Sequence, residues 1–147
     1  MNADKPPCFV DSNIWLYALL DMQEEKKRST AAQIIAQATI VISTQVINEV
    51  CRNLLKAGSF TEAEITEYIE SAYNRYRVIE LTKDVLLQAS ALRGQYAFSF
   101  WDSMIIASAL AANVSIVYSE DMQDQLLVES RLRIVNPFEY TMDGINL

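Results

Sequence analysis

The stretch that decides the fold of this chain is SFWDSMIIASALAANVSIVYSEDMQD, residues 99–124. Its middle, residues 103–119, carries no charge and reads as a buried helix, a short turn and a buried strand. Acidic residues stand at both ends, with Asp102 at the start of the helix and Asp121 shortly after the strand. If the helix packs antiparallel to the strand on one face of a sheet, these two ends lie at the same edge. The stretch therefore predicts that Asp102 and Asp121 are neighbours.

Outward from this stretch, short β-prone runs alternate with helical patterns along the chain. We expect further strands at residues 8–10, 39–42, 77–81 and 133–135. The residues that we assign to helix starts are Ser12, Glu24, Ser43 or Thr44, Thr61 and Thr82. Alternating strands and helices favour an α/β fold around a parallel sheet, in which ligands bind beyond the carboxyl ends of the strands.

The apolar positions of the helices predict which residues enter the core. Gly58 and Gly94 mark the expected ends of the third and fifth helices. The predicted apolar face of the second helix consists of Ala32, Ile35 and Ala36, with Ala31 at its margin. The predicted apolar face of the fifth helix consists of Leu86, Leu87, Ala89 and Leu92.

Composition and charge exclude several classes of function. The 147 residues are 51% hydrophobic and 21% charged, which is typical of one globular domain spanning residues 1–147. The net charge of −7 argues against binding nucleic acid through bulk electrostatics, but it leaves open an enzyme that holds phosphates at a metal-neutralised acidic pocket. Because the chain has no histidine, His-based acid–base catalysis, His-ligated zinc and the usual serine and cysteine triads are excluded.

The sequence contains no pattern typical of export or membrane insertion. Residues 1–11 lack a basic region followed by an apolar run, and residues 103–119 are interrupted by Asn113 and by serines. Cys8 and Cys51 have neither metal-site nor redox spacing, so we expect two reduced, buried thiols. We therefore expect a cytoplasmic protein without a membrane segment.

Four acids from distant segments map to one edge of the predicted sheet. Asp11 directly follows the first strand, whereas Asp102 and Asp121 flank the unit described above. Glu49 lies in the second turn of the helix after the second strand, at the margin of its apolar face. Four neighbouring carboxylates repel one another, and a hard cation such as Mg²⁺ or Mn²⁺ removes that repulsion. The four acids are therefore candidate metal ligands.

Each of these acids taken alone has a plainer explanation. Asp11 and Asp102 also stand where an acid caps a helix, and Asp102 completes a Ser99-x-x-Asp pattern. Glu49 alone is an ordinary solvated helix residue, and Asp121 alone is an ordinary turn residue. The coincidence of four acids at one edge is what favours a metal site.

Four blocks of the sequence, in order, resemble the motifs of the PIN domain family. The blocks are FVDSN at 9–13, TQVINE at 44–49, FWDSMIIASA at 100–109 and VYSEDMQD at 117–124. The resemblance spans residues 9–137, and in size and motif the chain is most similar to the VapC-type toxins of bacterial toxin–antitoxin pairs. One departure is Gln125, because the family often has a glycine soon after its last acid.

The resemblance implies a three-layer α/β/α sandwich with a central parallel sheet of four to five strands. It also implies a metal-dependent ribonuclease with Mg²⁺ or Mn²⁺ as cofactor, RNA as substrate, a small antitoxin protein as partner, and a homodimer. The positions that match the family's metal-binding acids are Asp11, Glu49, Asp102 and Asp121. The positions that match polar residues beside those ligands are Asn13, Ser119 and Asp124.

The reaction predicted at these four carboxylates is Mg-dependent hydrolysis of RNA phosphodiester bonds. Glu49 has two alternative roles, as a metal ligand or as the base that orients the attacking water. Arg52 and Lys56, one and two turns after Glu49, are candidate phosphate contacts, whereas the basic run 26–28 is more simply a solvated helix face.

Aromatic side chains near the predicted edge are candidate stacking partners for RNA bases. Trp15, Tyr17 and Trp101 belong to this group, although Trp101 is expected in the core. An alternative function is a catalytically silent PIN-like module that binds RNA or protein, but the intact set of four acids argues against it. A receiver-like domain phosphorylated on Asp11 is disfavoured because no lysine follows Lys83.

Overall fold

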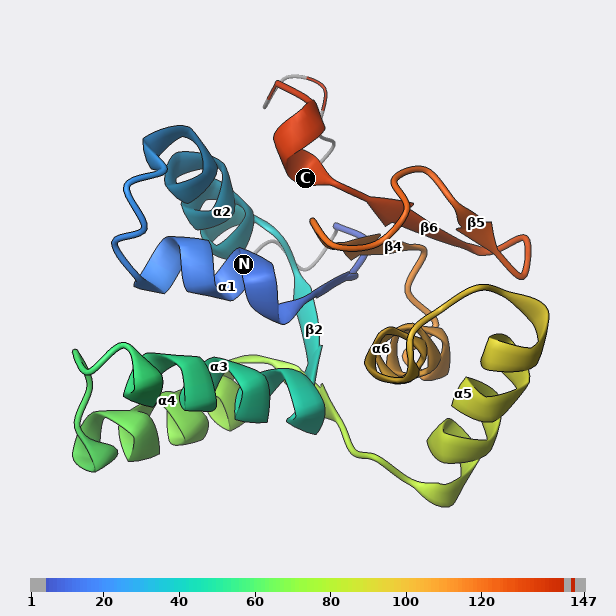
Figure 1. The fold of residues 1–147 in the computed structure, drawn as a ribbon, viewed down its shortest axis with the longest axis horizontal. Coiled ribbons are helices and arrows are strands. Elements are labelled where there is room, and N and C mark those ends of the chain that lie inside the picture. The colour runs from blue at the N-terminus through green and yellow to red at the C-terminus, as the bar shows by residue number, and fades with distance from the viewer. Residues whose placement is uncertain (1–4, 142–143, 145–147) are drawn as a thin grey trace.

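The computed structural model describes residues 5–141 and 144, which form a sheet flanked by helices (Figure 1). The strands are β1 (Cys8–Val10), β2 (Ile40–Ser43), β3 (Arg77–Ile79), β4 (Ile116–Tyr118), β5 (Leu127–Val128) and β6 (Leu132–Val135). The helices are α1 (Ser12–Leu19), α2 (Glu25–Gln37), α3 (Thr44–Lys56), α4 (Glu62–Arg75), α5 (Lys83–Gln95), α6 (Phe100–Ala111) and the short 3₁₀ helix η1 (Pro137–Glu139). The strand order is β3-β2-β1-β4-β6-β5, and the strands pair in parallel except for β5, which is antiparallel to β6.

The helices lie in two layers because the chain reverses its direction across the sheet. Strands β2 and β3 are added on one side of β1, whereas β4 lies on the other side. Since parallel crossovers are right-handed, helices before and after this reversal cover opposite faces of the sheet. Figure 1 shows α1 to α4 together at the left and α5 and α6 at the lower right. The predicted three-layer α/β/α sandwich is confirmed.

The sheet has one strand more than the four to five that were predicted. The additional strand, β5, consists of two residues and pairs with β6 through Leu127 opposite Arg133 and Val128 opposite Leu132. Two residues are too few to produce an alternating hydrophobic pattern, so no sequence signal marks this strand.

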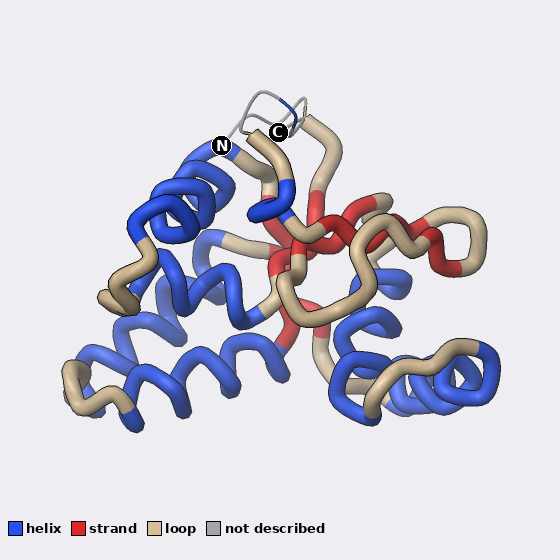
Figure 2. Tube along the Cα trace, turned by 45° about the horizontal axis from the view of Figure 1, so that its top comes forward, coloured by secondary structure: helices blue, strands red, loops and turns tan. Residues whose placement is uncertain are grey.

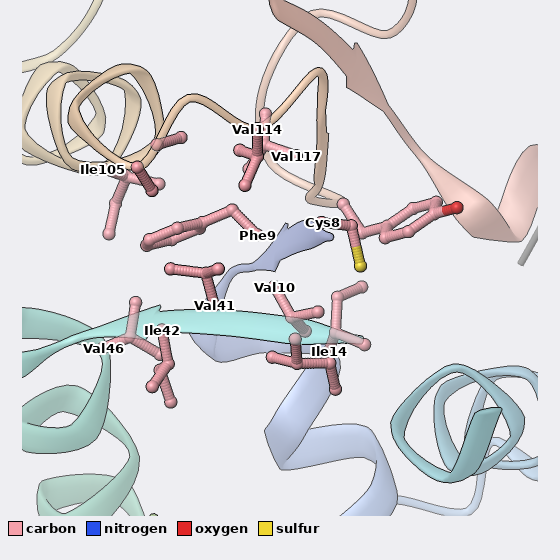
Figure 3. Close-up of a cluster of buried hydrophobic side chains, with 14 of the residues drawn as sticks. Cys8, Phe9, Val10, Ile14, Val41, Ile42, Val46, Ile105, Val114 and Val117 are labelled. Atoms are coloured by element: carbon pink, nitrogen blue, oxygen red, sulfur yellow. The ribbon is translucent and has the colours of Figure 1, made fainter. Parts of the chain in front are cut away.

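The two central strands, β1 and β4, lie in the middle of the molecule and are buried except for Ile116 at the start of β4, which is partly exposed (Figure 2). Phe9 and Val10 in β1 and Val117 in β4 are inaccessible to solvent. Figure 3 shows Phe9 and Val117 on the side of Val41 and Ile105, which come from β2 and α6, whereas Val10 lies beside Ile14 of α1. This packing fixes the carboxyl ends of β1 and β4 next to each other.

Local capping signals predict most helix starts correctly. Thr82 caps α5, and Thr61 and Glu64 form a reciprocal capping box at the start of α4. Helix α1 begins one residue earlier than predicted, because Asp11 is its cap and accepts a hydrogen bond from the Ser12 backbone N–H. Ser12, which was expected to cap this helix, is therefore its first helical residue.

The predicted apolar faces of α2 and α5 are confirmed for Ala31, Ala89 and Leu92, which are buried, but otherwise each face is rotated about the helix axis. Helix α2 buries Ala31 and Ile34, while Ala32 and Ala36 of the predicted face are exposed. In α5, Leu86 and Leu87 are 47% and 58% exposed. The residues of α5 that are buried are Val85, Ala89 and Leu92. The rotation is decided by the neighbours of each helix, α1 for α2 and α6 for α5, which a short apolar pattern does not specify.

The two cysteines are free and buried, as expected. Burial raises the pKa of the Cys8 thiol to about 12, which keeps it in the unreactive protonated form. Among the residues that the structure describes, no helix is both long enough and apolar enough to cross a bilayer.

Candidate active site

Asp11 lies at the carboxyl end of β1, where the sheet itself holds its backbone. Its N–H donates to the carbonyl of Tyr118 at 3.0 Å, which continues the β1–β4 pairing. The side chain is only 4% exposed. Its Oδ1 accepts from the Ser12 N–H at 2.7 Å, and its Oδ2 accepts from the Ser119 hydroxyl at 2.8 Å. The carboxylate is therefore immobilised between the ends of the two central strands.

The environment of Asp11 opposes ionisation. The pKa of Asp11 is raised to about 6, mainly by burial and also by the Glu49 and Asp102 carboxylates, and against the hydrogen bonds from Ser119 and Ser12, which lower it. No cation compensates this buried acid, since the single ion pair within residues 5–141 joins other residues. Asp11 is thus a buried acid that is charged at neutral pH without a counter-ion.

Glu49 projects from α3 and is held through both carboxylate oxygens. Its Oε2 accepts from the Ser12 hydroxyl at 2.7 Å, and its Oε1 accepts from Gln45 Nε2 at 2.9 Å. Gln45 Nε2 also donates to the carbonyl of Trp101 at 3.3 Å, which ties α3 to the first turn of α6. The Gln45 Oε1 is buried with no hydrogen-bond partner in the described structure, so the two acceptors of its amide nitrogen dictate the orientation of this side chain.

Asp102 lies in the first turn of α6, and Asp121 lies in the loop after β4. The N-cap of α6 is Ser99, whose hydroxyl accepts from the Asp102 N–H at 3.1 Å. Burial raises the pKa of Asp102, the Ser99 hydroxyl lowers it, and the Asp121 and Glu49 carboxylates raise it again. Asp102 and Asp121 line the same cavity of about 210 Å³. The start of α6 and the end of β4 therefore meet at one edge of the sheet, as expected.

Asn13 and Ser119 connect these elements. Asn13 Nδ2 lies 3.3 Å from Asp11 Oδ2 and 3.1 Å from Asp121 Oδ2, and its Oδ1 accepts from the Glu120 N–H. The Ser119 hydroxyl, fully buried, also accepts from the Asp121 N–H at 3.3 Å. Both residues lie where the sequence places them, beside the acids, and they fix the loop that carries Asp121.

The four acids are electrostatic neighbours, but they do not enclose a cation as they stand. The Glu49 and Asp102 carboxylates raise the pKa of Asp11, and the Asp121 and Glu49 carboxylates raise the pKa of Asp102. Within residues 5–141, no three acidic or thiol side chains are close enough together to hold a metal ion. The arrangement is an open cluster of carboxylates, fixed at Asp11 and Glu49 and more exposed at Asp121.

Asp124, which the resemblance placed beside the ligands, is bound to the C-terminal segment. Its Oδ1 accepts from the Asn136 N–H at 2.8 Å, and its Oδ2 accepts from the Tyr140 hydroxyl at 2.7 Å. Both oxygens are therefore used to hold the loop after β4 against the chain that follows β6.

Lys27, in the basic run expected to be solvated, instead forms an ion pair near the site. Its Nζ lies 2.6 Å from Glu120 Oε2, and Tyr17 donates its hydroxyl to Glu120 Oε1 at 2.7 Å. The Lys27 ammonium also lies over the rings of Tyr17 and Phe138, at 5.2 and 5.5 Å from their centroids. Tyr17 is therefore part of an ion-pair network. Arg52 and Lys56 are exposed on α3.

Two supporting residues, Gln45 and Arg93, were not identified from the sequence. Gln45 precedes Glu49 by four positions, so the i, i+4 spacing on a helix was an available signal. Arg93 Nη1 donates to the Ser103 hydroxyl at 2.7 Å, and its guanidinium lies over the Phe100 ring at 4.5 Å. These contacts cross from α5 to the start of α6, and no local pattern indicates them.

Comparison with known proteins agrees with this geometry. The model of the PIN domain family matches residues 8–136. No curated protein sequence matches the chain.

Several solved structures have the same fold. VapC20 of Mycobacterium tuberculosis, described as a sarcin-ricin loop cleaving toxin, is 21% identical with a TM-score of 0.61, over 78% of this chain and 89% of that one. A toxin–antitoxin complex from Klebsiella pneumoniae is 20% identical with a TM-score of 0.65, over 88% and 97%. FitAcB from Neisseria gonorrhoeae is 14% identical with a TM-score of 0.61, over 90% and 99%. At these identities the likeness concerns the fold.

Proposed function

Because this chain belongs to the PIN domain family, we propose that it is a metal-dependent endoribonuclease that hydrolyses RNA phosphodiester bonds. The observation that carries the proposal is the group of four neighbouring acids at the carboxyl ends of the strands, with no cation beside Asp11. A protein that used these acids only for stability would gain from a compensating lysine or arginine, as it does at Glu120. An uncompensated acidic cluster at this edge suits a cationic ligand.

The chemistry of the donors favours Mg²⁺ or Mn²⁺ as that ligand. Asp11, Glu49, Asp102 and Asp121 offer only carboxylate oxygens, which hard divalent cations prefer. Like charges without a counter-ion repel one another, and a bound divalent cation would remove that repulsion. Asp102 and Asp121 would hold such an ion from the cavity that both of them line.

The residues around the acids have separable tasks in this reaction. When bound, Mg²⁺ neutralises the phosphate charge and lowers the pKa of the attacking water. Ser12 and Ser119 hold Asp11 in one orientation as a ligand, and Asn13 positions the loop of Asp121. Ser12 and Gln45 leave Glu49 one further lone pair on each oxygen, which suits either a ligand or a group that orients water.

The proposed biological role is that of the toxin in a toxin–antitoxin pair, acting as a homodimer on cytoplasmic RNA. Support comes from the family and from solved structures of the same fold that are toxins or toxin–antitoxin complexes. The proposed partner is a small antitoxin protein that covers the acidic edge. A neighbouring gene for a small DNA-binding protein is the genomic observation expected from this role.

The activity is tested by cleavage of a structured RNA with Mg²⁺, with EDTA, and with the Asp11→Asn variant. Removing a direct ligand is expected to reduce the rate by more than the roughly 100-fold loss typical of groups that merely support a ligand. The matched control is Asp84→Asn, which makes the same change at an exposed position in α5. Cleavage that persists both in EDTA and in Asp11→Asn contradicts the proposal, and RNA binding without cleavage by the unaltered protein identifies a silent module instead.

A further inference from the structure

Trp101 is exposed at the edge of the acidic cluster, although its sequence context predicts a core residue. The side chain is 62% exposed, whereas the other tryptophan, Trp15, is 4% exposed. Burial in α6 begins only at Ser103, so the first turn of the helix projects beyond the core. The Phe100 ring contacts the Trp101 ring edge-on, with centroids 5.1 Å apart and an interplanar angle of 82°. An exposed indole is thus supported from one side next to Asp102.

Trp101 lines a groove together with Gln45, the residue that donates a hydrogen bond to Glu49. The groove has a volume of about 770 Å³ and lies between α3 and α4. Its polar lining comes from α3, whereas its apolar lining comes from both α3 and α4, with Leu81 and Trp101 in addition. The α3 residues with polar side chains in this lining are Thr44, Gln45, Asn48 and Arg52. Since Gln45 hydrogen-bonds both Glu49 and the Trp101 carbonyl, this wall is rigidly connected to the acidic cluster.

Arg52 supplies a positive charge to this groove. It lies three residues after Glu49 on α3, is exposed, and takes part in no ion pair within the described part of the chain. Asn48 precedes it by four residues, so the two side chains share one side of the helix. An unpaired guanidinium, an amide and an indole therefore line one groove, which Gln45 connects to Glu49.

We propose that this end of the groove binds one unpaired nucleobase of the RNA substrate, belonging to a nucleotide next to the scissile phosphate. The base stacks on the Trp101 indole, and Arg52 faces the backbone phosphate. The inference rests on the proposed ribonuclease function and adds a subsite to it. Continuity of the RNA chain supports it, because one amide group, that of Gln45, contacts both Glu49 and the Trp101 carbonyl, so a phosphate at the acids brings its neighbouring nucleotide to this side of the groove.

The chemistry of the groove favours a single-stranded nucleotide over a duplex. A base in a helix has both faces covered, whereas an unpaired base offers a face to an aromatic ring and an edge to polar groups. Asn48 and Thr44 can form hydrogen bonds with such an edge. The subsite therefore takes substrates that present unpaired bases, in a loop, a bulge or a single strand.

The test measures RNA binding in the Asp11→Asn background with Mg²⁺ present, by fluorescence anisotropy of a labelled single-stranded adenosine decamer. A decamer of abasic ribose phosphates carries the same charge without bases and serves as the second probe. We expect the adenosine decamer to bind more tightly, and Trp101→Ala to weaken its binding about tenfold while leaving the abasic probe unchanged. Trp101→Phe should restore part of the difference, because it keeps an aromatic face.

The Arg52→Ala variant tests the phosphate contact, whereas the Trp101 variants test the contact with the base. It should weaken binding of both decamers by the same factor, since it removes a phosphate contact, whereas Lys26→Ala on α2 should change neither affinity. Thermal unfolding of each variant confirms that the fold is kept. The subsite is overturned if Trp101→Ala weakens both probes equally, or if neither decamer binds.

The same variants distinguish a role of Trp101 in binding protein from the proposed role in binding a nucleobase. If Trp101→Ala leaves RNA affinity unchanged but dissociates a dimer in sedimentation velocity, the indole serves a protein interface and the subsite is wrong. Because binding is measured without cleavage, this failure is distinct from failure of the ribonuclease proposal, which cleavage by the unaltered protein decides.

Discussion

Two adjacent acids, Glu120 and Asp121, have opposite electrostatic surroundings. Glu120 lies beside a cation, whereas Asp121 lies beside another acid. Glu120 is neutralised by Lys27 and receives the Tyr17 hydroxyl, and its partner's ammonium lies against two aromatic rings. Among the described residues, the acids of the group to which Asp121 belongs receive only neutral donors and form no ion pair. The fold compensates an acid where it needs one for structure, and it leaves the neighbouring acids uncompensated. The contrast indicates that the acidic cluster is completed by something other than this chain.

The largest effect is expected from ionisation of Asp11, which changes the free energy of unfolding of the metal-free protein. The folded-state pKa of Asp11 is about 6 against an ordinary value of 3.8, so the folded state binds a proton more tightly than the unfolded state. Ionising Asp11 therefore destabilises the fold by up to about 3 kcal/mol at neutral pH, and this penalty disappears as the pH falls from 6 towards 3.8.

Denaturant unfolding in EDTA at several pH values measures this effect. The Asp11→Asn variant should be more stable than the unaltered protein at pH 7, and the difference should shrink at pH 4. The Asp84→Asn variant provides the reference for removal of an exposed acid. A difference between Asp11→Asn and the unaltered protein that does not change with pH contradicts the assigned environment of Asp11.

A smaller effect is expected at Gln45, which orients an acid without carrying charge. Gln45→Leu frees Glu49 from α6 and should reduce RNA cleavage by about 10- to 100-fold, the range typical of residues that support a ligand. Part of the loss should be recovered at high Mg²⁺ concentration, because the cation then orders Glu49 by itself. Gln37→Leu on the exposed side of α2 is the control, and equal losses in the two variants would indicate a general effect on stability.

Substitution of Asp102 distinguishes a role as metal ligand from a role at the start of helix α6. If it belongs to the uncompensated cluster, Asp102→Asn raises the stability of the metal-free protein and removes the stabilisation by Mg²⁺. If it only assists the start of α6, the substitution lowers stability by up to about 1 kcal/mol and leaves the Mg²⁺ response intact. Thermal unfolding with and without Mg²⁺ distinguishes the two, and we expect the first result.

The smallest effect is expected in the compensated environment. Lys27→Met removes a partly exposed ion pair and should lower the free energy of unfolding by less than about 1 kcal/mol. The Glu120 carboxylate raises the pKa of Lys27, so the stabilisation is complete below 10.5 and is lost only as the pH rises above that value. Chemical unfolding at pH 7 and at pH 11 measures this, and a large loss at pH 7 would mean that Lys27 is more deeply coupled to the site than its exposure indicates.

The sequence by itself determines the succession of helices and strands along the chain, except for β5, and the segments from which the acids come. These features depend on short-range signals, such as the capping box of Thr61 and Glu64 or the uncharged run at residues 103–119, and such signals act within a few residues. For the same reason Asp11 and Asp102 can be assigned to strand and helix ends, and the PIN domain motifs can be recognised in order.

Tertiary structure alone decides which side chains meet. The contact from Gln45 to the Trp101 carbonyl, the ion pair of Lys27 with Glu120 and the exposure of Leu87 depend on how helices rotate against their neighbours. That rotation follows from the packing of the whole core, to which residues far apart in sequence contribute. The sequence therefore identifies the acids, and the fold determines that they remain without a cation.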